Sequence, residues 1–271
     1  MTRTLIYNIP GNGNIKALLF DHTIKTYDFL NSEHYNHIKY LKNINQLGRL
    51  RYVYPGAHHN RYEYVYLQWA FITELVKQKD NFGLGTQRNF YGKINSCSKY
   101  PTTGELLQCL VLLTNIGYSE ATFAGNRAWL HSIKNNNELR RTFKQGLPKE
   151  AYGILEEIIE SFDFYRFQHL ITLFLLQRYR RRDDGEVDFL TNLLIGYIKK
   201  EDDSIHKIKL WDLFNNIRKI SFLTLDSLYS PVPFSLRLSS IILSFDEYYK
   251  DMILKKTGYT QALIELESVL Q

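Results

Sequence analysis

The chain has 271 residues, 44% of them hydrophobic and 23% charged, which is the composition of an ordinary globular protein and excludes a disordered or fibrous one. Its formal net charge of +6 permits a nucleic acid or a phosphorylated molecule as a partner but is too small to require one. Cys97 and Cys109 lack CxxC spacing, which argues against a disulfide scaffold and a zinc knuckle. The first residues contain no hydrophobic signal core, and no apolar run approaches the about 18 residues that a membrane span needs, so we expect a cytoplasmic protein that does not enter a membrane.

The first part of the chain, residues 1–30, predicts a small β element. Residues 4–8 alternate between apolar and polar side chains, and residues 10–14 carry the proline and glycines of a turn. Apolar stretches follow at 15–20 and 24–29. We therefore expect a sheet of two or three strands.

Two helices should follow this sheet. Apolar side chains recur at helical spacing between residues 32 and 47, and Gly48 is a suitable C-terminal cap. Asn60 can cap a second helix that runs to about Lys79. The next segment, 81–101, is rich in glycine and polar residues and is the longest irregular stretch, so it is a candidate lid or binding loop.

The helix after this loop has the clearest start signal in the chain. Thr102 with Glu105 three residues later forms a capping-box pattern, and residues 106–113 are almost entirely apolar. A helix of that composition is predicted to lie in the middle of a bundle. A turn at 114–117 should end it, and residues 118–133 resume a helical pattern.

The rest of the chain alternates helical segments with short polar breaks, and no internal repeat or linker interrupts it. The helices predicted there are 137–145, 149–161, 163–180, 186–199, 208–229, 235–250 and 258–270. The sequence therefore predicts one mainly α domain over residues 1–271 with a small N-terminal β element.

Two adjacent histidines, His58 and His59, precede Glu63 at a spacing found in metal sites. Adjacent histidines point in different directions, however, and no second cluster of histidine or aspartate follows to complete a coordination shell. A polar contact at the start of the helix is therefore the preferred interpretation.

The densest basic run ends the helix predicted over 163–180, where cations interact favourably with the helix dipole. Acidic side chains at Asp183, Asp184 and Glu186 follow at once and offset its charge. We prefer a solvated surface or a partner interface to a nucleic-acid contact for the residues of this run, which are Arg178, Arg180, Arg181 and Arg182.

One stretch resembles a known family. Residues 46–48 (Gln-Leu-Gly), 52–57 (Tyr-Val-Tyr-Pro-Gly-Ala) and 59–63 (His-Asn-Arg-Tyr-Glu) together resemble the opening motif of the HD-domain deoxynucleoside triphosphate triphosphohydrolases, the group that includes the SAM-and-HD-domain protein. That motif ends in a histidine that is the first metal ligand. In this chain the corresponding residue is Tyr64.

Two further blocks carry the resemblance. Residues 112–118 are similar to the family's apolar helix ending in His-Asp-(Ile/Leu)-Gly-His, but Thr114 and Asn115 replace the ligand pair. Tyr118 and Phe123 fall where the family has catalytic histidines. Residues 218–227 are similar to the family's third block, with Arg218 in place of the last metal-binding aspartate, and with Lys219 and Asp226 keeping the phosphate- and sugar-contacting residue types.

Enzymes of this family hold a divalent metal with two histidines and two aspartates, and the metal polarises the phosphoryl oxygen and activates water. Threonine and asparagine are poor ligands, tyrosine is protonated near neutral pH, and arginine repels a cation. The resemblance thus implies a mainly α, HD-domain-like helical bundle, with its core at 32–135 and 208–235, in which no metal and no cofactor binds at Tyr64, Thr114, Asn115 and Arg218.

Our leading hypothesis is a catalytically inactive HD-domain protein that binds a nucleotide or phosphate without hydrolysis, or that serves as an interaction scaffold for a protein partner or a second copy. Arg61 is the best candidate donor to an anion. The competing interpretation is that Arg61 only pairs with Glu63 or with a neighbouring helix. The residues expected to contact phosphate are His59, Arg61, Arg218, Lys219 and Asp226.

Two other classes of function stay open on the sequence. One is an active nucleotide phosphohydrolase or nuclease with a different site, built from His58, His59, Glu63 or Glu120. The other is a nucleic-acid-binding subunit of a larger complex, such as a defence complex, that uses the basic run.

Overall fold

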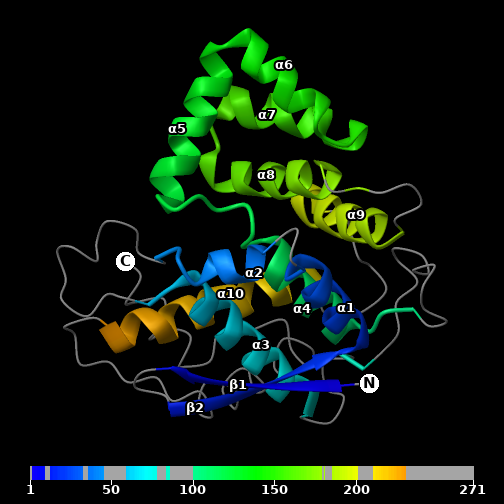
Figure 1. Ribbon diagram of the computed structural model, residues 1–271, viewed down its shortest axis with the longest axis vertical. Helices are drawn as coiled ribbons and strands as arrows, with labels where there is room; N and C mark the ends of the chain where they lie inside the picture. The colour runs from blue at the N-terminus through cyan, green and yellow to red at the C-terminus, as the bar shows by residue number, and fades with distance from the viewer. Residues whose placement is uncertain are drawn as a thin grey trace, which may run out of the picture.

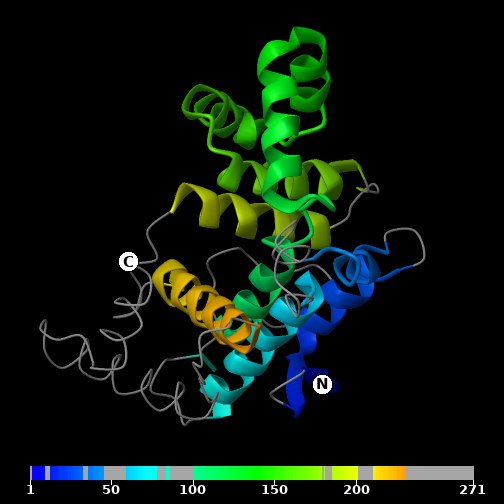
Figure 2. The ribbon, with the colours of Figure 1, turned by 90° about the vertical axis from the view of Figure 1, so that its left-hand side faces the viewer.

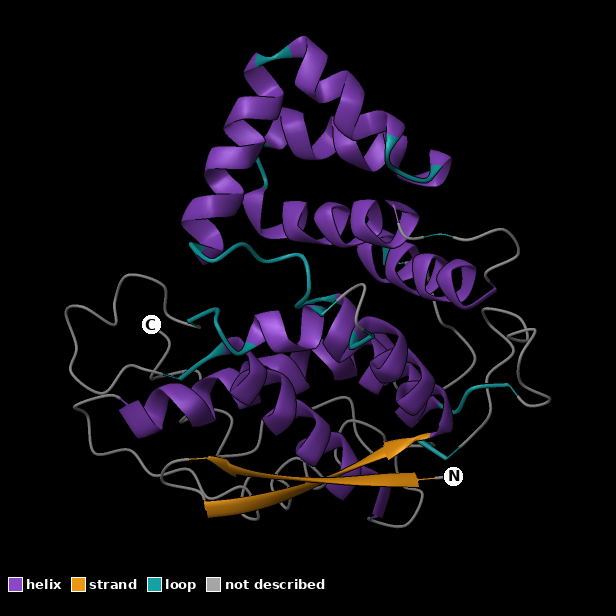
Figure 3. Ribbon diagram, in the orientation of Figure 1, coloured by secondary structure: helices purple, strands orange, loops and turns teal. Residues whose placement is uncertain are grey.

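The computed structural model describes residues 2–9, 13–32, 36–45, 59–77, 84–85, 100–178, 180, 185–200 and 210–229. Within these ranges the chain is mainly helical with one small N-terminal sheet, which confirms the predicted class (Figure 3). The predicted cap at Gly48, most of the loop 81–101 and the helices 235–250 and 258–270 lie outside the described residues. None of the described helices is both long and apolar enough to cross a membrane.

The sheet is an antiparallel pair of β1 (Thr2–Ile9) and β2 (Gly13–Phe20). The third strand considered for 24–29 is wrong, because this stretch belongs to the helix α1 (Asp21–Leu30). The outer edge of β2 has no room for another strand, since its backbone groups already bond to helices: the Leu18 N–H donates to Thr73 Oγ1 at 2.9 Å, and Gln108 Nε2 donates to the Leu18 carbonyl at 2.7 Å.

The helix predicted over 32–47 is much shorter than expected. The described part of this stretch contains α2 (His37–Leu41), followed by a turn to Asn45. The backbone N–H of Arg61 donates to the Ile44 carbonyl at 2.8 Å, so this carbonyl serves the start of the next helix and not α2. Ile38, Leu41 and Ile44 are nevertheless buried, as their spacing predicts.

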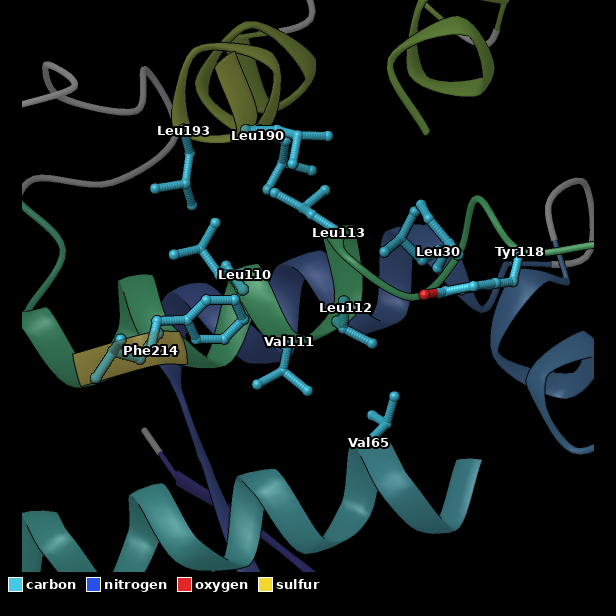
Figure 4. Packing of buried hydrophobic residues seen from close by; sticks show 14 of the residues in the cluster. Leu30, Val65, Leu110, Val111, Leu112, Leu113, Tyr118, Leu190, Leu193 and Phe214 are labelled. Atoms are coloured by element: carbon cyan, nitrogen blue, oxygen red, sulfur yellow. The ribbon is translucent and has the colours of Figure 1, made fainter. Parts of the chain in front are cut away.

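The main core is built around α4 (Thr103–Leu113), against which α3 (Arg61–Lys77) and α10 (Leu210–Tyr229) pack. The capping box that begins α4 is present, and every residue of α4 is buried, so its predicted place inside the bundle is confirmed. Figure 4 shows why this apolar helix is stable. Leu110 and Leu113 point toward α9, whereas Val111 points toward Val65 on α3.

The remaining helices stack above this core in Figures 1 and 2, and the sheet lies below it. They are α5 (Thr122–Asn135), α6 (Asn137–Gln145), the 3-10 turn η2 (Lys149–Ala151), α7 (Tyr152–Ser161), α8 (Phe164–Arg178) and α9 (Gly185–Lys199). Residues 114–121 form the connector between α4 and α5 (Figure 3).

The connector delays the helix predicted from residue 118, because its first part packs tightly on α8. A Cβ added at Gly117 would overlap the carbonyl oxygen of Gln168 and lie 2.7 Å from Thr172 Oγ1. Thr172 Oγ1 in turn donates to the Leu113 carbonyl at 2.9 Å. The chain therefore crosses α8 as a turn and becomes helical only at Thr122.

Candidate functional site

The site begins at the first turn of α3, where the chain fixes Arg61 in the interior. Asn60 caps the helix as predicted, since its Oδ1 accepts from the Glu63 N–H at 2.9 Å. Asn60 also pairs with Asn45 in a β-bridge, which holds the entry to α3 against the turn after α2. The side chain of the next residue, Arg61, is thereby directed inward and is only 1% exposed.

The guanidinium of Arg61 has few partners for a buried cation. Its Nη1 donates to Asn115 Oδ1 at 3.2 Å, and its Cζ lies 3.5 Å from the ring centroid of Tyr118. Nε and Nη2 have no acceptor among the described residues. Burial lowers the pKa of Arg61, and the positive charge of Arg218 adds to this effect, whereas the neighbouring Tyr118 and Tyr64 act in the opposite direction. An arginine nevertheless retains its proton in proteins.

The second cation of the site is Arg218, in the middle of α10. Its Nη1 donates to the Tyr197 hydroxyl at 2.9 Å, and its backbone carbonyl accepts from the Tyr64 hydroxyl at 3.1 Å. Its Nε has no acceptor among the described residues. Burial raises the pKa of Tyr64, so this hydroxyl stays protonated and acts as a donor.

His169, on α8, lies near Arg218, although no sequence pattern singles it out. Burial, together with the charges of Arg218 and Arg166, lowers the pKa of His169 to about 3, so the imidazole is neutral near pH 7. Its ring packs edge-on against Tyr197 at 5.6 Å. No local motif marks His169 or Tyr197, because only the packing of α8 and α9 against α10 brings them to Arg218.

Three of the residues that the HD-family resemblance aligns with metal ligands, namely Tyr64, Asn115 and Arg218, lie together in the structure, with Arg61 among them. Thr114 is also buried, but its hydroxyl is engaged elsewhere, since it donates to the Leu110 carbonyl at 2.8 Å. Neither Arg61 nor Arg218 forms an ion pair with a carboxylate in the part of the chain that the structure describes. The result is a pair of cations surrounded by tyrosines.

The residues present do not fit a divalent metal. The Tyr64 hydroxyl and Asn115 Oδ1 are already engaged in hydrogen bonds, and the two guanidinium groups beside them would repel a cation. Across the described ranges, no group of three or more histidine, cysteine, aspartate or glutamate side chains could hold a metal ion.

Other predicted site residues have different surroundings. His59 is fully buried and makes contacts of its own. Burial raises the pKa of Glu63, and the neighbouring imidazole of His59 opposes this rise. Asn60 Nδ2 donates to Glu63 Oε1 at 3.2 Å, so Glu63 pairs with its capping residue and not with Arg61. Lys219 is exposed, and the side chain of Asp226 lies outside the described residues.

The basic run is only partly described. Arg178 is exposed, and Arg180 forms an ion pair with Asp188 at 2.8 Å and a hydrogen bond to Gln177. Arg181 and Arg182 lie outside the described residues. An arginine already paired with an acidic side chain is less available to phosphate groups, which favours the interpretation of this run as a solvated surface.

Comparison of the chain with protein-family models, with curated proteins and with solved structures found no match in any of the three. The resemblance to the HD-domain family therefore depends on the motif residues alone.

Proposed function

We propose that this chain is an HD-domain-like protein without a metal centre, which binds a phosphate-bearing ligand between Arg61 and Arg218 and does not hydrolyse it. One observation carries the proposal: a guanidinium that is 1% exposed keeps two nitrogens, Nε and Nη2, without an acceptor among the described residues, close to a second cation. A buried charge is costly unless a counter-charge or a full set of hydrogen bonds compensates it.

A phosphate group supplies what this site lacks. Its oxygens accept pairs of N–H bonds from an arginine fork, and its negative charge offsets two neighbouring cations. Arg61 offers Nε and Nη2, and Arg218 offers Nε. Tyr118 covers the Arg61 guanidinium, so a ligand reaches it only when this ring moves.

The same residues support binding without hydrolysis. A metal in a phosphohydrolase lowers the pKa of its bound water and so generates the nucleophile. Arginine and tyrosine can stabilise negative charge on a phosphate, but neither activates water in this way. His169 stays neutral near pH 7, yet it is buried and packs against Tyr197.

The test measures binding and turnover on the same samples. Pyrophosphate and dATP are titrated into the purified protein by calorimetry, and dATP turnover is followed with Mg, Mn, Co and Zn. The proposal expects binding without metal and no turnover. Arg61→Met should weaken binding at least tenfold, whereas Arg61→Lys, which keeps the charge but loses the fork, should weaken it less.

Arg180→Met is the matched control, because it removes an exposed arginine that is already paired with Asp188. Wild-type affinity in this variant would show that the effect of Arg61→Met is specific to the site. Metal-dependent turnover abolished by Arg61→Met would overturn the claim of inactivity. Absence of binding by both ligands would overturn the binding claim and favour a scaffold.

A further inference from the structure

A cavity of about 520 Å³ lies between the two layers of helices, outside the arginine cluster. Its walls come from α2, from the connector after α4, and from α5 and α8. Figure 1 shows the connector rising past α2 to the lower end of α5. A volume of this size is typical of a pocket that encloses one small molecule.

The cavity has aromatic walls contributed by three separate elements. These side chains are Tyr40 from α2, Tyr118 from the connector and Trp129 from α5. Trp129 is 53% exposed, although the chain's two other tryptophans, Trp69 and Trp211, are buried. A large indole left half in solvent beside a cavity is a surface on which a flat ring could stack.

The aliphatic part of the lining and its charge restrict the ligand further. Ile116, Ile171 and Leu175 provide an apolar floor. Burial lowers the pKa of His37 and keeps its imidazole neutral, so Lys39 is the charged side chain among the described lining residues. None of those lining residues is acidic, although burial and the nearby charge of Glu120 both raise the pKa of Tyr40 on one wall. An apolar floor, stacking walls and a cation at the rim are the features of a site for a flat anion.

We infer that this cavity binds a planar aromatic anion, with its ring between Trp129 and the two tyrosines and its negative group at Lys39. This site is separate from the proposed phosphate site, and its existence does not depend on that proposal. Tyr118 is the residue common to both, since it lines the cavity and stacks on Arg61 at 3.5 Å.

Three probes separate shape from charge. Naphthalene-2-sulfonate is flat and anionic, naphthalene-2-methanol is flat and neutral, and cyclohexanesulfonate is anionic but not flat. Binding is measured by calorimetry and by acrylamide quenching of tryptophan fluorescence. We expect naphthalene-2-sulfonate to bind most tightly and to protect Trp129 from the quencher, because the other two tryptophans are already buried.

The variants test the position of the bound probe. Trp129→Leu should weaken the binding of naphthalene-2-sulfonate by about tenfold, which corresponds to the loss of one stacked aromatic pair. Lys39→Met should weaken the binding of naphthalene-2-sulfonate and leave the affinity for naphthalene-2-methanol unchanged. Asn43→Trp, at an exposed rim position, should block both flat probes by filling the cavity. Tyr165→Leu is the control, because Tyr165 is 59% exposed and does not line the cavity.

Several outcomes would overturn the inference. Equal affinity for cyclohexanesulfonate would show that no flat ring is recognised. Unchanged affinity in both Trp129→Leu and Asn43→Trp would place the probe elsewhere. Absence of binding by all three probes at millimolar concentration would show that the cavity takes no ligand of this class. Arg61→Met distinguishes the two sites, since it should weaken pyrophosphate binding at least tenfold and leave naphthalene-2-sulfonate bound.

Discussion

The stability of the Arg61→Met variant distinguishes an anion site from an ordinary structural arginine. Methionine has an unbranched side chain that can follow much of the arginine's path, so the change removes the guanidinium with limited loss of packing. The variant gives up the hydrogen bond to Asn115 at 3.2 Å and the stacking on Tyr118 at 3.5 Å. It also removes the cost of holding a cation away from water beside Arg218.

These opposing effects are of similar size. A desolvated cation–π contact contributes about 2 kcal/mol, and a charged hydrogen bond contributes about 1.5–3 kcal/mol. The penalty for burying an uncompensated ion is several kcal/mol even after relaxation. In buffer without phosphate or sulfate we therefore expect the free energy of unfolding of Arg61→Met to lie within about 1 kcal/mol of wild type, or above it.

Urea unfolding with and without pyrophosphate measures this difference. Pyrophosphate at a hundred times its wild-type dissociation constant should stabilise wild type by about 2.7 kcal/mol and Arg61→Met, which binds at least tenfold more weakly, by no more than about 1.4 kcal/mol. A loss of about 3–5 kcal/mol by the variant in anion-free buffer is the refuting result. It would mean that the folded protein already compensates this charge and that the arginine is structural.

Two further predictions concern the interior around the site. Gly117→Ala should lower the free energy of unfolding in urea by about 1–3 kcal/mol, because its new Cβ overlaps the backbone of α8, whereas Gly153→Ala, with nothing within 4 Å, should be neutral or slightly stabilising. Equal effects of the two substitutions would contradict the close contact. Burial, with the charges of Arg218 and Arg166, holds the pKa of His169 at about 3, so as the pH falls below about 6.5 this histidine takes up a proton in the unfolded chain but not in the folded one. Between pH 7 and pH 5 the free energy of unfolding of wild type should therefore fall by about 2 kcal/mol more than that of His169→Gln, and parallel pH curves would contradict the assignment.

Local chemistry made part of the fold predictable. The capping box at Thr102 and Glu105 satisfies backbone groups within four residues, so it needs no distant partner and appears as the sequence predicts. The same holds for Asn60 at the start of α3. The limits of α2 depended on a carbonyl that bonds across the fold to Arg61, and nothing near Ile44 in the sequence indicates this.

In the candidate site, too, the residues could be selected from the sequence but their contacts across the fold could not. Residues within the motif blocks, such as Arg61, Asn115 and Arg218, could be selected from the sequence, and the structure places them in one cluster. The stacking of Arg61 on Tyr118 could not be predicted, because it depends on how closely the connector crosses α8 at Gly117. His169 was missed for a related reason, since a lone histidine within an apolar helix has no local signal.

The proposed function also explains how a phosphate site could keep affinity while losing catalysis. A divalent metal and an arginine both attract phosphate oxygens, but only the metal binds water and lowers its pKa. Here Arg218 is fixed by hydrogen bonds with Tyr64 and Tyr197, and Arg61 is fixed by Asn115 and Tyr118. On this assignment restoring one ligand, as in Tyr64→His, would restore no activity, because both cations would still oppose a metal at the same place.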